Sequence, residues 1–85
     1  MTTATLKLYA SLGDYLPANA VKNTVEIKVG AESPTVADLL ARYNVPMEQC
    51  HLVLINGLFV PPGSRATRHV AAGDTLAVWP PVAGG

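Results

Sequence analysis

Two kinds of hydrophobic periodicity succeed one another along this chain, and their order restricts the fold more than any other feature. Apolar and polar residues alternate in Thr5–Ala10 and again in Thr24–Val29, which predicts two half-buried strands. Apolar residues then recur at helical spacing, which predicts an amphipathic helix. The apolar stripe of that helix is Val36, Leu39, Leu40 and Tyr43.

In the first strand we expect Leu6, Leu8 and Ala10 to face the core, and Thr5, Lys7 and Tyr9 to face away from it. The segment Ser11–Asn23 contains glycine, proline and two asparagines, which is typical of a connection with one turn of helix. The first two strands are therefore predicted to form a hairpin with a long loop.

The ends of the helix are also marked in the sequence. Thr35 is a suitable N-cap, and Asp38 stands three residues later, where an acidic side chain completes a capping box. We expect the helix to end at Asn44, and Pro46 just beyond it supports this end.

The second half of the chain predicts three more strands. Leu52–Ile55 is continuously apolar, and we expect it to be buried on both faces. Asn56-Gly57 is a strong hairpin signal, after which Leu58–Val60 returns as a short strand. Thr75–Trp79 is the last strand.

This order of elements predicts an α+β fold in which one main helix lies across one face of a small mixed sheet. Two hairpins flanking a crossover helix place the first and last long strands together in the sheet centre. That is the β-grasp, or ubiquitin-like, arrangement. We expect residues 1–79 to form this domain and residues 80–85 to form a flexible tail ending in Gly-Gly.

Charge and cysteine content exclude several classes of function. Six basic and six acidic side chains cancel, which argues against a nucleic-acid partner and against electrostatic binding to membranes. Met1–Thr3 lacks the charged start of a secretory signal, and a single cysteine, Cys50, forms no internal disulfide. We therefore expect a cytoplasmic protein. No metal site is expected, because Cys50, His51 and His69 do not form a ligand cluster.

The tail Val82–Gly85 is the feature that bears most directly on function. Glycine has no Cβ, so Gly84 and Gly85 can pass through a slot that larger residues would block. If Gly85 is the last residue, its carboxylate is ionised at neutral pH and becomes an acyl donor once it is converted to a mixed anhydride. A frayed terminus without function is the alternative interpretation.

The chain resembles the MoaD/ThiS family of ubiquitin-like sulfur carriers over nearly its whole length. The resemblance is carried by Leu8–Ala10, Val36–Leu40, Val53–Gly57 and above all Gly73–Gly85. The ending Pro-Pro-Val-Ala-Gly-Gly is most similar to that of the small subunit of molybdopterin synthase. Ser11–Pro17 departs from that subfamily, which often has an arginine and a glutamate there, so the pathway stays open.

The resemblance implies a sulfur relay in which this chain is a carrier rather than an enzyme, although it could count as the small subunit of a sulfurtransferase. An E1-like partner would adenylate the Gly85 carboxylate with ATP. A persulfide or sulfide donor would then convert it to a thiocarboxylate. A sulfur-accepting enzyme, such as the molybdopterin synthase large subunit, would take the sulfur. The chain itself has no P-loop, and we expect no bound cofactor.

Within this interpretation the tail has two parts. Pro80 and Pro81 favour an extended base, and the segment from Pro80 to Gly85 spans about 20 Å when extended. The tail residues that would enter a partner's channel are Pro80, Pro81, Val82, Ala83 and Gly84. Trp79 and Phe59 are docking candidates, although packing against the sheet explains an aromatic residue equally well.

Other side chains have simpler interpretations. Arg65, Arg68 and Lys7 are expected to form a solvated face, and Cys50 is expected to be a small semi-buried hydrophobic residue. Three functions compete with molybdopterin synthesis. They are sulfur transfer for thiazole (thiamine) or another pathway, ubiquitin-like modification of lysines, and a β-grasp interaction module whose tail is unused.

Overall fold

The computed structural model describes residues 2–31 and 33–81, so Val82–Gly85 lie outside the described residues. The elements in chain order are β1 (Thr3–Leu8), the 3₁₀ turn η1 (Ala10–Tyr15), β2 (Thr24–Lys28), α1 (Val36–Arg42), η2 (Met47–Gln49), β3 (Leu52–Ile55), β4 (Leu58–Phe59), η3 (Pro62–Ser64) and β5 (Thr75–Trp79).

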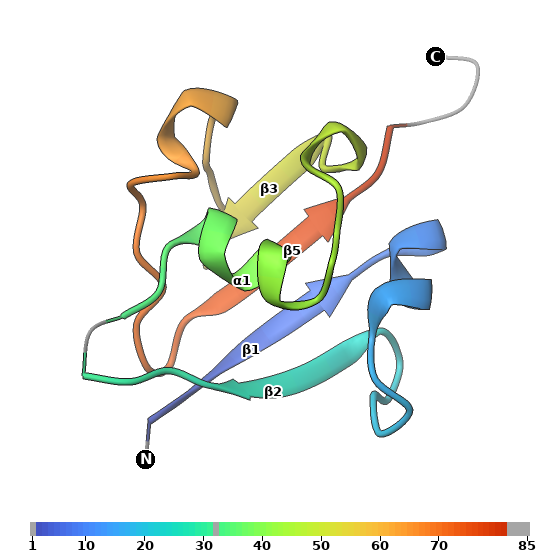
Figure 1. Cartoon of the computed structure of the whole chain (residues 1–85), viewed down its shortest axis with the longest axis horizontal. Helices are drawn as coiled ribbons and strands as arrows, with labels where there is room; N and C mark the ends of the chain where they lie inside the picture. The colour runs from blue at the N-terminus through green and yellow to red at the C-terminus, as the bar shows by residue number, and fades with distance from the viewer. Residues whose placement is uncertain (1, 32, 82–85) are drawn as a thin grey trace.

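The five strands form one mixed sheet in the order β2-β1-β5-β3-β4. β1 and β5 run parallel, and the other neighbouring pairs are antiparallel. Figure 1 shows β1 and β5 side by side with α1 lying across one face of the sheet. The β-grasp prediction, with the first and last long strands at the centre, is confirmed.

The helix begins and ends where its capping residues predict. The Thr35 hydroxyl accepts a hydrogen bond from the Asp38 amide, and the Asp38 carboxylate accepts one from the Thr35 amide. These bonds hold the pKa of the Asp38 carboxyl below its ordinary value. The helix ends at Arg42 with Tyr43 as its C-cap, and the left-handed backbone of Asn44, with φ of 61°, follows directly.

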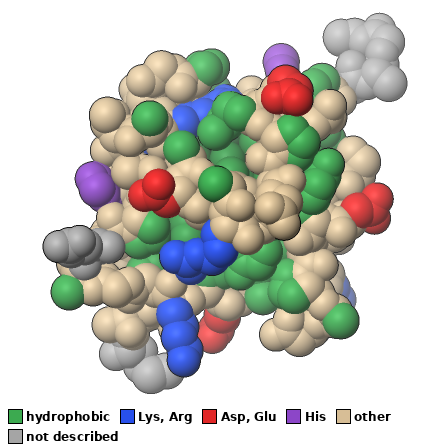
Figure 2. Space-filling view, in the orientation of Figure 1, with side chains coloured by type: hydrophobic (Ala, Val, Ile, Leu, Met, Phe, Trp, Pro, Cys, Tyr) green, Lys and Arg blue, Asp and Glu red, His purple; other side chains and the backbone are tan. Residues whose placement is uncertain are grey.

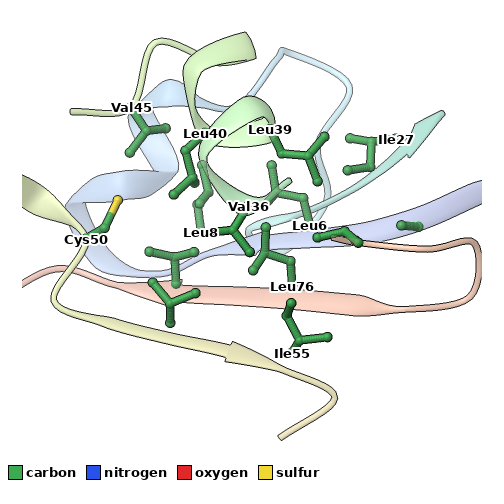
Figure 3. Packing of buried hydrophobic residues seen from close by; sticks show 14 of the residues in the cluster. Leu6, Leu8, Ile27, Val36, Leu39, Leu40, Val45, Cys50, Ile55 and Leu76 are labelled. Carbon is green, nitrogen blue, oxygen red and sulfur yellow. The ribbon is translucent and has the colours of Figure 1, made fainter. Parts of the chain in front are cut away.

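The core lies between α1 and the sheet. Val36, Leu39 and Leu40 point from the helix into a layer of fully buried strand residues (Figure 3). That layer contains Leu6, Leu8, Val53, Ile55, Leu76 and Val78. Tyr43 packs against the edge of this cluster, so the predicted helical stripe is confirmed.

Two burial predictions for the strands are wrong. Ala10 does not continue the inward row of β1, because the strand ends at Leu8 and Ala10 opens η1 with φ of 51°, exposed to solvent. β3 is not buried on both faces: Val53 and Ile55 are fully buried, whereas Leu52 and Leu54 are half-buried. The reason is that α1 covers only one face of the sheet.

The long loop between β1 and β2 is held to the end of β1 by Asn23. Its side-chain amide donates to the Leu8 carbonyl at 2.8 Å, and its own carbonyl accepts from the Leu8 amide at 3.0 Å. A Cβ on Gly13 would lie 2.6 Å from the Asn23 amide nitrogen. A side chain at position 13 would therefore displace the Asn23 amide from the Leu8 carbonyl.

Candidate functional site

The chain leaves the sheet at Trp79, the last residue of β5. The Trp79 carbonyl accepts a hydrogen bond from the His51 amide at 2.9 Å. Pro80 and Pro81 come next and have no amide to donate, so the pairing cannot continue. The predicted tail residues Pro80 and Pro81 follow the sheet directly, and the rest of the predicted tail lies outside the described residues.

Trp79 itself is half-buried against Tyr9. The two rings stack with centroids 4.4 Å apart and planes inclined by 7°. Tyr9 follows β1 directly, and its amide donates to the Val78 carbonyl at 3.0 Å, which fixes it beside the end of β5. The stack therefore packs Trp79 against Tyr9 at the base of the tail while part of the indole stays accessible. The alternation of Thr5–Ala10 predicts that Tyr9 faces away from the core, but it gives no sign that Tyr9 pairs with Trp79.

We call the sheet face opposite α1 the open face. Residues opposite one another on paired strands share a face. Leu54 pairs with Ala77 on one side and with Phe59 on the other. Leu54 and Ala77 each stand between buried residues of their strands, so these two residues and their partner Phe59 lie on the open face. Leu52 pairs with Trp79 in the same way. The resulting apolar patch consists of Tyr9, Leu52, Leu54, Phe59 and Trp79, together with Ala77, which is only 8% exposed.

Phe59 is the most exposed of these residues, at 56%. It stands on β4, immediately after the Asn56-Gly57 turn, whose two residues both have positive φ, as a tight hairpin requires. Leu58 is 69% exposed, but it pairs with Ile55 and therefore belongs to the helix side. Phe59 and Trp79, the two docking candidates, thus lie on the same face, with Leu52 and Leu54 between them.

A polar network holds the β3–β4 hairpin to the start of β5. The Asn56 side chain donates to the Asp74 carboxylate and accepts from the Thr75 amide, both at 2.9 Å. The other Asp74 oxygen accepts from the Ala71 amide at 2.9 Å. The hydrogen bonds from Ala71 and Asn56 hold the pKa of Asp74 below its ordinary value.

One sequence prediction fails near the tail base. Arg65 does not belong to a solvated face, because it is only 3% exposed. Its guanidinium donates to the carbonyls of Cys50, at 2.7 Å, and His51, at 3.4 Å. Arg68 is exposed as expected, and Lys7 is half-exposed. A burial prediction for arginine needs the positions of its acceptors, and sequence periodicity does not supply them.

Cys50 packs in the core cluster like a hydrophobic residue, as predicted, but it is buried more deeply than the predicted semi-buried position. Burial raises the pKa of its thiol above the ordinary value, which makes a reactive thiolate unfavourable. His51 is exposed, and His69 Nδ1 lies 2.6 Å from the Ser33 carbonyl oxygen. Residues 2–31 and 33–81 contain neither a metal-binding group of side chains nor a pocket.

Comparison with known proteins matches the ThiS family model over residues 16–85. The chain belongs to the ThiS family. The family is one of ubiquitin-like sulfur carriers, and the predicted resemblance is confirmed. No curated protein sequence matches the chain significantly.

Two solved structures share the fold. The crystal structure of SAMP1 from Haloferax volcanii is 27% identical, covers 98% of this chain and 99% of its own, and has a TM-score of 0.64. The structure of H. volcanii small archaeal modifier protein 1 is 25% identical, covers 96% of this chain and 100% of its own, and has a TM-score of 0.63. Both structural similarities extend over the β-grasp domain.

Within the described part of the chain, no helix is long and apolar enough to cross a bilayer.

Proposed function

We propose that this chain carries sulfur as a thiocarboxylate on Gly85 and delivers it to an enzyme of molybdopterin biosynthesis. The observation that carries the proposal is the end of β5. A rigid strand stops at the Trp79–Tyr9 stack, two prolines follow, and the remaining sequence is Val-Ala-Gly-Gly. Membership of the ThiS family supports the carrier role.

The chemistry needs a partner at each step. In the first step a Gly85 carboxylate oxygen attacks the α-phosphorus of ATP, pyrophosphate leaves, and an acyl adenylate forms on the E1-like enzyme. Hydrosulfide then attacks the acyl carbon, and AMP leaves. A persulfide donor would in addition need a thiol to reduce the acyl disulfide. The sulfur acceptor finally takes the thiocarboxylate sulfur, and water restores the carboxylate. The tether makes each attack effectively intramolecular within the docked complex.

We propose that the apolar patch is the surface on which these partners dock. Trp79 stands at the point where the tail begins, and Phe59 lies across the patch on β4. A partner that covers this face would receive the tail directly, because residues 80–85 are about 20 Å long when extended. Residues 1–79 would then serve for docking and residues 80–85 for reaction.

Three variants test the proposal in an ATP–pyrophosphate exchange assay with the cognate activating enzyme. Deleting Gly85 should abolish exchange. Gly84→Val should obstruct the channel with its branched Cβ, and one alanine added after Gly85 should displace the carboxylate. Thermal stability should not change in any variant, because the buried core residues lie between Ala4 and Val78. Wild-type exchange by the Gly85 deletion would refute the carrier function.

The added alanine also separates the carrier from a simple interaction module, which would bind its partner equally well with the longer tail. A sulfur carrier should further show an intact mass about 16 Da higher in cells, because sulfur replaces one oxygen. Methionine oxidation gives nearly the same increment, so fragmentation must place the sulfur on Gly85.

Protein modification is the second candidate, and the likeness to small archaeal modifier protein 1 favours it. The same acyl adenylate would then be transferred to lysine amines. Conjugates that resist denaturation and end in Gly-Gly on target lysines would establish this function. Thiazole synthesis and other sulfur-transfer pathways use the same chemistry. The sulfur-accepting enzyme that binds the thiocarboxylate form would distinguish these pathways from molybdopterin synthesis.

A further inference from the structure

Arg65 is the only charged side chain buried among residues 2–31 and 33–81. Its partners are the carbonyls of Cys50 and His51 and the sulfur of Met47, the last at 3.7 Å, rather than a carboxylate. Its Nε atom is buried without a hydrogen-bond partner. No carboxylate offsets the cost of burying this charge, so the two carbonyls must supply that compensation. The position of the guanidinium is therefore tied to those carbonyls.

The two carbonyls belong to the segment that holds the tail base. The peptide between Cys50 and His51 carries the amide that donates to the Trp79 carbonyl at 2.9 Å. The carbonyl on the opposite side of the same peptide is that of Cys50, which accepts the shorter Arg65 bond of 2.7 Å. One peptide thus joins the guanidinium directly to the last residue of β5.

The other end of Arg65 is fixed to a different part of the fold. Its carbonyl accepts a hydrogen bond from the Ala37 amide at 3.0 Å in the first turn of α1. Its amide donates to the Pro62 carbonyl at 3.4 Å in η3. Arg65 therefore connects the start of α1, through its backbone carbonyl, to the segment before β3, through its guanidinium. The Cys50–His51 peptide extends this connection to the end of β5.

We propose that Arg65 is a positioning residue that fixes the direction in which the chain leaves β5 toward the reactive terminus. Arg65 orients the Cys50–His51 peptide, and that peptide in turn holds the carbonyl of Trp79. The role in sulfur transfer rests on the proposed function, whereas the effect on the end of β5 can be measured without it.

Amide hydrogen exchange followed by NMR tests the structural part. In Arg65→Met the His51 amide should exchange at least about tenfold faster, because the carbonyl that shares its peptide loses a charged donor. The Thr5 amide, bonded to the Asp74 carbonyl at the far end of β5, should change by less than about twofold. Arg65→Lys should give an intermediate value. Arg68→Met, at an exposed arginine of the same loop, should leave both amides unchanged.

Steady-state kinetics of adenylation test the functional part. If Arg65 positions the tail, Arg65→Met should raise the KM for the carrier several-fold and leave kcat unchanged, since the freed segment must be ordered again on docking. Arg65→Lys should recover part of the loss. Parallel loss of protection at His51 and Thr5 in both variants would show a purely structural role and overturn the proposal. An unchanged KM despite faster His51 exchange would overturn its functional part. If the wild type itself shows no adenylation, the proposed function fails while the exchange result on Arg65 stands.

Discussion

The two faces of the sheet are made by alternate residues of the same strands, yet they differ in how deeply their side chains are buried. On the helix side, Leu6, Val53, Ile55, Leu76 and Val78 are fully buried beneath α1. On the open face, the neighbours of these residues along β3 and β5 include Leu52, Leu54 and Trp79, which remain half-exposed.

The open face is itself divided along the line between β1 and β5. Its β2–β1 half carries polar and charged side chains, namely Thr3, Thr5, Lys7, Thr24, Glu26 and Lys28. Its β5–β3–β4 half carries the apolar patch. Folding does not require apolar residues on an uncovered face, and a contiguous apolar area at a surface is typical of a binding site. The comparison therefore supports the proposal that one face serves stability and half of the other serves recognition.

The largest effect on stability is expected from a substitution on the helix side of the sheet. Leu40→Ala removes a fully buried side chain from α1 and should lower the free energy of unfolding by about 2–5 kcal/mol. Urea denaturation measures this as a lower midpoint. If the midpoint is unchanged, the helix side does not stabilise the fold, and the difference in role between the two faces is contradicted.

The next effect concerns recognition. Phe59→Ala should weaken binding to the activating enzyme by about fivefold or more, while the free energy of unfolding changes by less than about 0.5 kcal/mol. Leu58→Ala is the matched control, because Leu58 is adjacent and more exposed but belongs to the helix side. Calorimetric titration measures both affinities. Equal losses in the two variants would contradict docking on the open face.

A smaller effect is expected from the network that joins the hairpin carrying Phe59 to β5. Hydrogen bonds lower the pKa of Asp74 in the folded state below its unfolded value of 3.8. The carboxylate therefore stabilises the protein fully above about pH 4, and this contribution is lost as the pH falls through the folded pKa. Asp74→Asn should reduce the urea midpoint near pH 7 and flatten its decline in acid. A parallel decline in both proteins would assign the acid sensitivity to other groups.

The smallest effect is expected from salt. The net charge is zero, and Figure 2 shows charges of both signs scattered over the helix side. If the partner binds the apolar patch, its affinity should change little between low and moderate ionic strength. A steep loss of affinity would instead indicate docking through exposed cations. Arg68 is one such residue, whereas the buried Arg65 is not.

Much of the fold could be predicted because its signals are local. The capping box of Thr35 and Asp38, the Asn56-Gly57 turn and the alternation of β1 and β2 each act within a few residues. The end of β1 was missed because Ala10 is apolar and continues the pattern, although the backbone turns there. Burial of both faces of β3 was predicted because an apolar run does not show whether a second layer covers it.

The same distinction between local and long-range signals applies to the candidate site. The sequence by itself determined the strand–helix order, the helix caps, the hairpin and the ending Pro-Pro-Val-Ala-Gly-Gly, because each depends on neighbouring residues. Only the tertiary structure decided which side chains meet across strands. It stacked Trp79 on Tyr9, placed Phe59 beside Leu54, and buried Arg65 against the Cys50 and His51 carbonyls. These contacts join residues far apart in the chain, so their existence depends on strand register and loop packing, which no local pattern specifies.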